Sequence, residues 1–172
     1  MTDRRLILLR HAKSAWPDGI GDEKRPLAPR GQKAAPRMGA YMARERLIPD
    51  LVLVSTARRT QDTWGLIAPN LPKGVKKRDI EAIYEAPPNR LVEVVRDTSA
   101  TVRCLMLVGH NPGLQQFALA LVGAGDADAV RRLGEKYPTA GLAVFDFALE
   151  SWSDIHAGTG TLERFVTPKS IA

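Results

Sequence analysis

The chain has 172 residues, of which 44% are apolar and 26% are charged, a balance typical of a globular domain with a sizeable core. No apolar run approaches the ~20 residues of a membrane span, and the short N-terminal apolar run lacks the features of a signal peptide. The single cysteine, Cys104, excludes an internal disulfide, and its apolar neighbours indicate a buried thiol. We therefore expect one cytoplasmic domain over residues 1–172, without membrane association.

The formal net charge of +6 is compatible with two classes of partner, nucleic acids and anionic substrates. The basic residues are scattered, apart from a cluster at residues 73–78 that has no interleaved aromatic residues and no nucleic-acid motif. The charge therefore favours an enzyme for anionic substrates, and no nucleic-acid partner is expected.

The first element is a continuous apolar run at residues 6–9, which predicts a buried parallel strand. The polar loop that follows, 13–30, is rich in proline and glycine, and loops of this length are usually functional. A helix is predicted over 32–46, with Pro36 near its first turn, where proline is tolerated.

The second buried strand is predicted at residues 51–54, directly before Ser55 and Thr56. These two residues are expected to cap a helix that continues to about Leu66. The stretch 75–80 predicts a short third strand.

The third helix is predicted over 89–97 and the fourth strand over 101–108. A fourth helix follows at 114–122, and the glycine-rich stretch 123–129 is expected to be a mobile connection. This alternation of strands and helices is typical of a parallel sheet.

Two late strands are predicted at residues 140–147 and 162–166, as antiparallel edge strands, with a loop or hairpin at 152–160 between them. The complete order predicts an α/β protein with a three-layer α/β/α architecture. Its central sheet would be mostly parallel and covered by helices on both faces.

Two of the three histidines directly follow predicted strands. His11 follows the first strand through Arg10, and His110 follows the fourth. Ligands bind at the carboxyl edge of such sheets, where we also expect the helix that carries Arg59 to begin. Two imidazoles, at least two guanidiniums and a helix N-terminus together predict a pocket for a dianion.

An imidazole surrounded by arginines can also react, because neighbouring positive charge disfavours its protonated form. A neutral histidine is a competent nucleophile toward phosphorus, and its product is a phosphohistidine that water can hydrolyse. The third histidine, His156, is expected in a surface loop without a role.

Three motifs occur in order along the chain: Arg10-His11-Ala12; Ser55, Arg59 and Thr63 at spacings of four; and Val-Gly-His-Asn-Pro at residues 108–112. With these motifs the chain resembles the histidine phosphatase superfamily, which has the phosphoglycerate mutase-like fold. The family's Arg-His-Gly appears here with alanine in place of glycine, as in the small SixA-type phosphohistidine phosphatases. The run Arg-Pro-Leu-Ala-Pro-Arg-Gly at 25–31 also resembles that subgroup.

The resemblance implies a role for each matching residue. His11 would be the nucleophile, and Arg10, Arg59 and His110 would bind the phosphoryl group and stabilise its transition state. It implies no metal and no organic cofactor. We also expect a set of residues to contribute to substrate binding: Ser14, Arg25 and Glu85.

The identity of a general acid stays open between Glu81 and Glu85. A leaving group such as the imidazole of a phosphohistidine would depend less on such an acid. The resemblance to the SixA-type subgroup implies phosphohistidine in a protein as the preferred substrate, and the alternative is a small-molecule phosphomonoester. From a different class, the chain could be a phosphate-dependent binding module without turnover. The sequence does not specify an oligomeric state.

Overall fold

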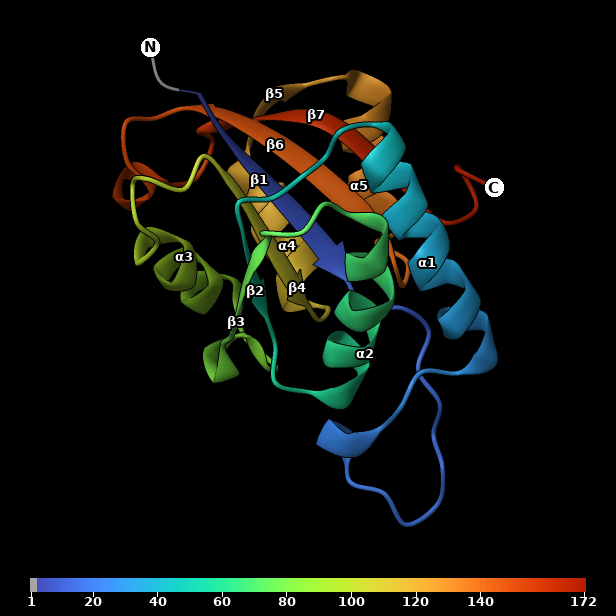
Figure 1. Cartoon of the computed structure of the whole chain (residues 1–172). Coiled ribbons are helices and arrows are strands. Elements are labelled where there is room, and N and C mark those ends of the chain that lie inside the picture. The colour runs from blue at the N-terminus through green and yellow to red at the C-terminus, as the bar shows by residue number, and fades with distance from the viewer. Residues whose placement is uncertain (1–2) are drawn as a thin grey trace.

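A computed structural model describes residues 3–172, and one sheet forms the centre of the fold (Figure 1). Its strands within the described residues are β1 (Asp3–Arg10), β2 (Leu51–Val54), β3 (Lys76–Asp79), β4 (Cys104–Gly109), β5 (Val122–Gly125), β6 (Leu142–Ala148) and β7 (Gly160–Val166). The α-helices are α1 (Pro29–Arg44), α2 (Arg58–Ile67), α3 (Pro88–Arg96), α4 (Gly113–Leu121) and α5 (Ala127–Glu135). None of these helices is long and apolar enough to cross a bilayer.

The strands lie in the order β3-β2-β4-β1-β6-β7-β5. β6 is antiparallel to both of its neighbours, whereas the other paired strands of the sheet run parallel. The expected mostly parallel sheet is therefore confirmed. Both late strands are present, and β6 is antiparallel as expected. Their expected place at an edge is wrong, because β6 and β7 lie inside the sheet, and β7 runs parallel to β1.

Successive side chains along a strand point to opposite faces of the sheet, and a layer of helices covers each face. On β1, Leu6 and Leu8 pack into the core that α3, α4 and α5 cover, whereas Ile7 and Leu9 pack under α1 and α2. In Figure 1, α2 lies in front of the sheet and α4 behind it. Because both faces are covered, strands such as β2 are buried at every position and read as continuous apolar runs. The three-layer architecture is confirmed.

The loop after β1 leaves the carboxyl end of that strand and projects beyond the sheet before it enters α1 (Figure 1). A bridge between Ser14 and Leu27 closes its base, and the Ala28 amide donates to the Lys13 carbonyl at 2.9 Å. This anchored backbone lets α1 begin at Pro29, three residues earlier than predicted. Pro36 consequently lies inside the helix, and its predicted place near the first turn is wrong.

The start of α2 also differs from the prediction. Ala57 is its N-cap residue, without a side-chain hydrogen bond, so the predicted capping by Ser55 and Thr56 is wrong. The Ser55 hydroxyl instead lies within hydrogen-bond distance of His110.

The stretch predicted as a mobile connection, 123–129, contains most of β5 and the start of α5. The side chain of Asp126 accepts a hydrogen bond from the Ala129 amide at 2.9 Å and caps α5. Asp128 also pairs with Arg132 one turn later, at 2.9 Å. Local polar contacts therefore help to order the start of α5, whose buried side chains are Ala129 and Leu133.

Candidate active site

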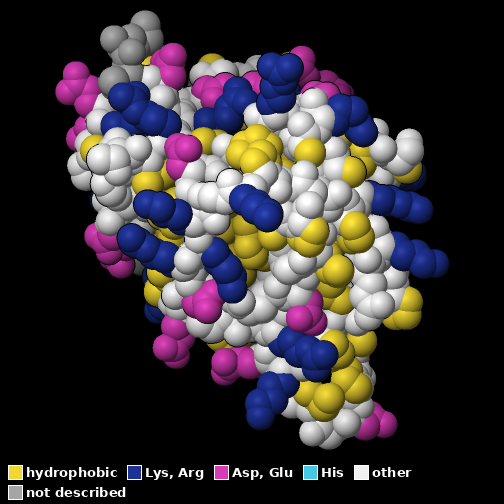
Figure 2. Space-filling model, viewed as in Figure 1, with side chains coloured by type: hydrophobic (Ala, Val, Ile, Leu, Met, Phe, Trp, Pro, Cys, Tyr) yellow, Lys and Arg dark blue, Asp and Glu magenta, His cyan; other side chains and the backbone are white. Residues whose placement is uncertain are grey.

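Two buried imidazoles meet at the carboxyl ends of β1 and β4. These strands are adjacent and parallel, with Arg10 opposite Gly109, so the next residue of each is a histidine at the same sheet edge. The ring centroids of His11 and His110 are 5.4 Å apart, and the two residues are only 6% and 7% exposed. No histidine is visible on the face of the molecule in Figure 2. The structure thus brings together the pair that the sequence singled out.

The His11 ring has a defined tautomer. Its Nδ1 lies 2.7 Å from the carbonyl oxygen of Ala12, and a carbonyl can only accept, so Nδ1 carries the proton. The Ala12 amide in turn donates to Thr63 Oγ1 at 3.0 Å, and this hydroxyl donates to the Arg59 carbonyl at 2.6 Å. The free lone pair of His11 is therefore on Nε2, on a ring whose neighbouring backbone is held by α2.

The His110 ring is held by β2 and by a tyrosine. Its Nε2 lies 2.7 Å from Ser55 Oγ, directly after β2. The Tyr84 ring meets it edge-on at a centroid distance of 5.5 Å. Its Nδ1 is buried and has no hydrogen-bond partner in the described part of the chain. Unpartnered buried nitrogen is costly unless a ligand can bind to it.

Two arginines frame the imidazoles, and both are anchored through their terminal nitrogens. Arg10 Nη1 donates to the Tyr137 carbonyl at 2.9 Å. Arg59 Nη1 donates to the backbone carbonyl of Asp22 at 2.8 Å, and its Nη2 donates to the carboxylate of that residue at 3.1 Å. The Nε atoms of both arginines are buried and lack partners among residues 3–172. Fixed guanidiniums with free N–H groups suit the oxygens of a phosphoryl group.

The site keeps both imidazoles neutral. Burial is the main cause that lowers the pKa of His11 to about 4, and the charges of Arg10, Arg59 and Arg25 act in the same direction. Burial also lowers the pKa of His110 to about 3, with further contributions from His11 and Arg59. The expected effect of the arginines is present, but desolvation is the larger cause.

An aspartate that the sequence analysis did not identify links the loop to the site. Asp22 Oδ1 accepts from Arg25 Nε at 3.1 Å, and its Oδ2 accepts from Arg59 and from the hydroxyl of Tyr84. The Tyr84 hydrogen bond is the main cause that lowers the pKa of this carboxyl to about 2, and Arg59 and Arg25 lower it further. Asp22 lies in an aperiodic loop, and the only sequence signal was the length of that loop.

Two of the expected substrate-binding residues lie close to these groups, and the third is less well placed. Ser14 and Arg25 are buried, and Arg25 Nη1 donates to Ser14 Oγ at 2.8 Å. Glu85 is exposed and has a positive φ of 52°, next to Tyr84. Within residues 3–172, neither Glu85 nor Glu81 forms a side-chain hydrogen bond or ion pair with the histidines or arginines of the site. Across the same residues, no group of three or more His, Cys, Asp or Glu side chains could hold a metal ion.

Sequence comparisons place these residues in a family context. The model of the histidine phosphatase superfamily (branch 1) matches residues 6–86, which include both arginines and His11. A Mycobacterium tuberculosis protein described only as uncharacterised is 37% identical over 163 residues, which cover 94% of this chain and 100% of that protein.

Solved structures extend the similarity to the whole chain. A crystal structure from Agrobacterium tumefaciens, named for the phosphohistidine phosphatase SixA, has a TM-score of 0.81 and 31% identity, covering 96% of this chain and 98% of that one. The protein histidine phosphatase SixA complexed with tungstate has a TM-score of 0.78 at 16% identity, with coverages of 98% and 99%. A mycobacterial glucosyl-3-phosphoglycerate phosphatase has a TM-score of 0.63, also at 16% identity, with coverages of 94% and 98%.

Proposed function

The chain belongs to the histidine phosphatase superfamily and is of the SixA type, and from this premise we propose that it dephosphorylates phosphohistidine in proteins through a covalent intermediate on His11. One observation supports the proposal most strongly. The His11 ring is neutral, holds its proton on Nδ1 and keeps the lone pair of Nε2 free among buried guanidiniums. This combination gives a nucleophile next to groups that bind its target.

In the first step, His11 Nε2 attacks phosphorus and forms a P–N bond. The bond from phosphorus to the substrate's imidazole breaks, and its electron pair leaves with that imidazole, which takes a proton from water. The His11 ring then carries positive charge, which the Ala12 carbonyl stabilises through the Nδ1 proton. Arg10, Arg59 and His110 donate hydrogen bonds to the three equatorial oxygens, where charge is spread in the transition state.

In the second step, a water molecule attacks the phosphorus of the phosphorylated His11. The P–N bond breaks, its electron pair returns to Nε2, and phosphate leaves with the oxygen and both protons of that water, one of which neutralises the hydroxide formed in the first step. The same donors serve both transition states, so the ring returns to its starting tautomer without a change in its hydrogen bond to Ala12.

The acids around the site favour phosphohistidine over an ester. An alkoxide leaving group needs a proton, whereas an imidazole is a much better leaving group. Asp22 is the carboxyl group bonded to Arg59, and its pKa near 2 keeps it ionised and unable to donate at neutral pH. Burial and the Asp22 carboxylate raise the pKa of the Tyr84 hydroxyl, so it is a weak acid as well.

The proposal is tested by metal-free turnover. The full chain is incubated in EDTA with a phosphohistidine-bearing protein and, separately, with glycerol phosphate, an ester whose alkoxide leaving group needs a proton. We expect kcat/KM to be higher for phosphohistidine and to fall by about 10³ or more in His11→Ala. The matched control is His156→Ala, because His156 is the exposed third histidine and we expect its replacement to leave turnover unchanged. A quenched wild-type reaction should also carry an acid-labile phosphoryl group on His11.

Two results would contradict the proposal. A higher kcat/KM for the ester would identify a small-molecule phosphomonoesterase. Phosphate binding without turnover of either substrate would identify a binding module.

A further inference from the structure

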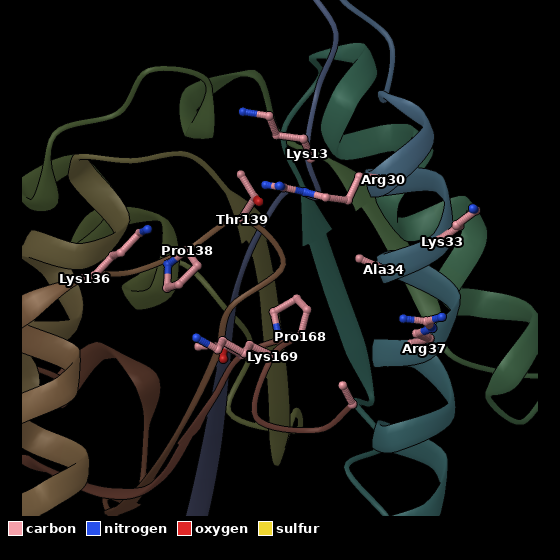
Figure 3. Close-up of a pocket in the computed structure, with 12 residues that line it drawn as sticks. Lys13, Arg30, Lys33, Ala34, Arg37, Lys136, Pro138, Thr139, Pro168 and Lys169 are labelled. Carbon is pink, nitrogen blue, oxygen red and sulfur yellow. The ribbon is translucent and has the colours of Figure 1, made fainter.

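A second pocket lies beside the candidate active site and contains none of its histidines. This cavity of about 650 Å³ is bounded by α1, by residues 136–139 and by residues 167–172 (Figure 3). Its volume is in the range of small-molecule sites, which is roughly 300–1,000 Å³. Arg10, Arg59, His11 and His110 do not line it.

The pocket and the phosphoryl site share a wall of backbone. Lys13, two residues after His11, lines the pocket. The Ala140 amide lies 3.0 Å from the carbonyl oxygens of both Arg10 and His11, and Arg10 Nη1 is bonded to the Tyr137 carbonyl. Pro138 and Thr139, which lie between these anchors, face the pocket. The two sites are therefore adjacent and separately lined.

The lining is strongly positive. Six of its twelve residues are basic, and they come from four separate segments: Lys13, Arg30, Lys33, Arg37, Lys136 and Lys169. No lining residue is Asp or Glu, and within residues 3–172 none of the six basic side chains forms an ion pair. In Figure 3, Arg30 extends from α1 toward Thr139 and Lys13, whereas the amino group of Lys33 points away. On the face in Figure 2, basic and acidic side chains both occur.

Local structure does not account for this concentration of charge. Arg30 is the second residue of α1, and this first turn contains no acidic residue. The positive end of the helix dipole disfavours a cation there. Like charges from four segments also repel one another, so the arrangement destabilises the fold slightly unless an anion offsets it.

We propose that this pocket binds the oligophosphate group of a small molecule. Several cations around a concave space match several linked phosphates, which carry more charge than the single phosphoryl group bound at His11. The hydroxyls of Thr139 and Thr167 add donors, while Ala34, Pro138 and Pro168 give an apolar surface for an attached organic group. An acidic protein would instead cover about 800 Å² of this chain, whereas the six basic residues gather around the cavity itself.

The test is calorimetric titration of inorganic triphosphate into the full chain, with saturating orthophosphate present to occupy the phosphoryl site. We expect one triphosphate to bind, with an affinity that falls as salt is raised. In the pocket variant Arg30→Gln/Lys136→Gln/Lys169→Gln, which removes one cation from each wall, we expect affinity to fall about tenfold or more. Neither the experiment nor its outcome depends on turnover, so the pocket can be confirmed even where the proposed phosphatase reaction fails.

A matched control removes the same number and type of charges elsewhere. The exposed residues Lys73, Lys76 and Arg78 lie at and near the β3 edge, and their triple replacement by Gln should change affinity by less than about threefold. An equal loss in both triple variants, or no triphosphate binding in the wild type, would overturn the proposal. A polyglutamate peptide that binds more tightly than triphosphate, and is weakened by the pocket variant alone, would replace it with an acidic protein partner.

Discussion

The hydrogen bond between His11 Nδ1 and the Ala12 carbonyl leaves one reactive nitrogen, and burial sets the pH range in which its lone pair is free. Protonation of Nε2 would abolish nucleophilicity, and the pKa of about 4 keeps the ring neutral at every pH above that value. We predict that kcat/KM falls as the pH is lowered, with a midpoint near pH 4, well below the ordinary histidine pKa of about 6.5. The measurement is a pH profile of phosphohistidine hydrolysis, corrected for the substrate's own titration. An acidic limb centred near pH 6.5 would contradict this assignment.

Asp22 places a negative charge beside Arg59, where we propose that the phosphoryl group binds. Asp22→Asn keeps an oxygen that can accept from Arg59 and removes the charge that repels an anion. We predict that inorganic phosphate inhibits this variant about threefold more tightly, because removing a like charge from a carboxylate that is 40% exposed is worth about 0.2–1 kcal/mol. The measurement is the inhibition constant of phosphate against phosphohistidine hydrolysis. The control is Glu23→Gln, the neighbouring exposed acid, and an equal change in both variants would show a general charge effect instead.

At the scale of elements, the first turn of α1 packs closely against the backbone segment that follows His11. A Cβ added at Gly31 would lie 2.1 Å from the Lys13 carbonyl oxygen, two residues from His11, so backbone must move to accept it. We predict that Gly31→Ala lowers the free energy of unfolding by about 1–3 kcal/mol and reduces turnover as well. Urea denaturation and kcat/KM measure the two effects.

The matched control is another helical glycine. Gly65 lies in α2, is exposed, and an added Cβ there meets no atom within 4 Å. Gly65→Ala should stabilise the protein by about 0.5–1 kcal/mol, because alanine restricts the unfolded chain and favours the helix. If both variants had the same stability, the close approach at Gly31 would not be a constraint on the fold.

Elements with a strong periodic signal were predictable, and those held by tertiary or local polar contacts were not. The strands β1, β2 and β4 are buried on both faces, so an uninterrupted apolar run identified each of them. The segment 122–135 lacks such a run, because β5 is glycine-rich and α5 depends on its Asp126 cap. The place of β6 inside the sheet follows from pairing with β1, and no local pattern encodes that choice. The paired histidines could be predicted because each follows a strand in the sequence. The role of Asp22 could not, because it depends on residues that lie near it only in the folded chain.

At the scale of the whole molecule, a fold that buries two neutral imidazoles at one sheet edge must lose stability in acid. The sign follows from proton binding. Between about pH 4 and 6.5 the unfolded chain protonates both histidines and the folded chain does not, so the free energy of unfolding rises with pH across this window. The lowered pKa of Asp22 also makes stability fall in acid, but only below its unfolded value near pH 4, so the two effects occupy different windows.

We predict that the free energy of unfolding falls by about 5 kcal/mol between pH 7 and pH 4.5, a large share of the 5–15 kcal/mol typical of such a domain. Urea denaturation at the two pH values measures the change. The double variant His11→Gln/His110→Gln cannot bind these protons in either state, so its stability should change by less than about 1 kcal/mol over the same interval. An equal decline in wild type and double variant would mean that other groups cause the acid sensitivity. A smaller decline in the variant would show that these two buried histidines, which we propose to take part in the reaction, also cause the loss of stability in acid.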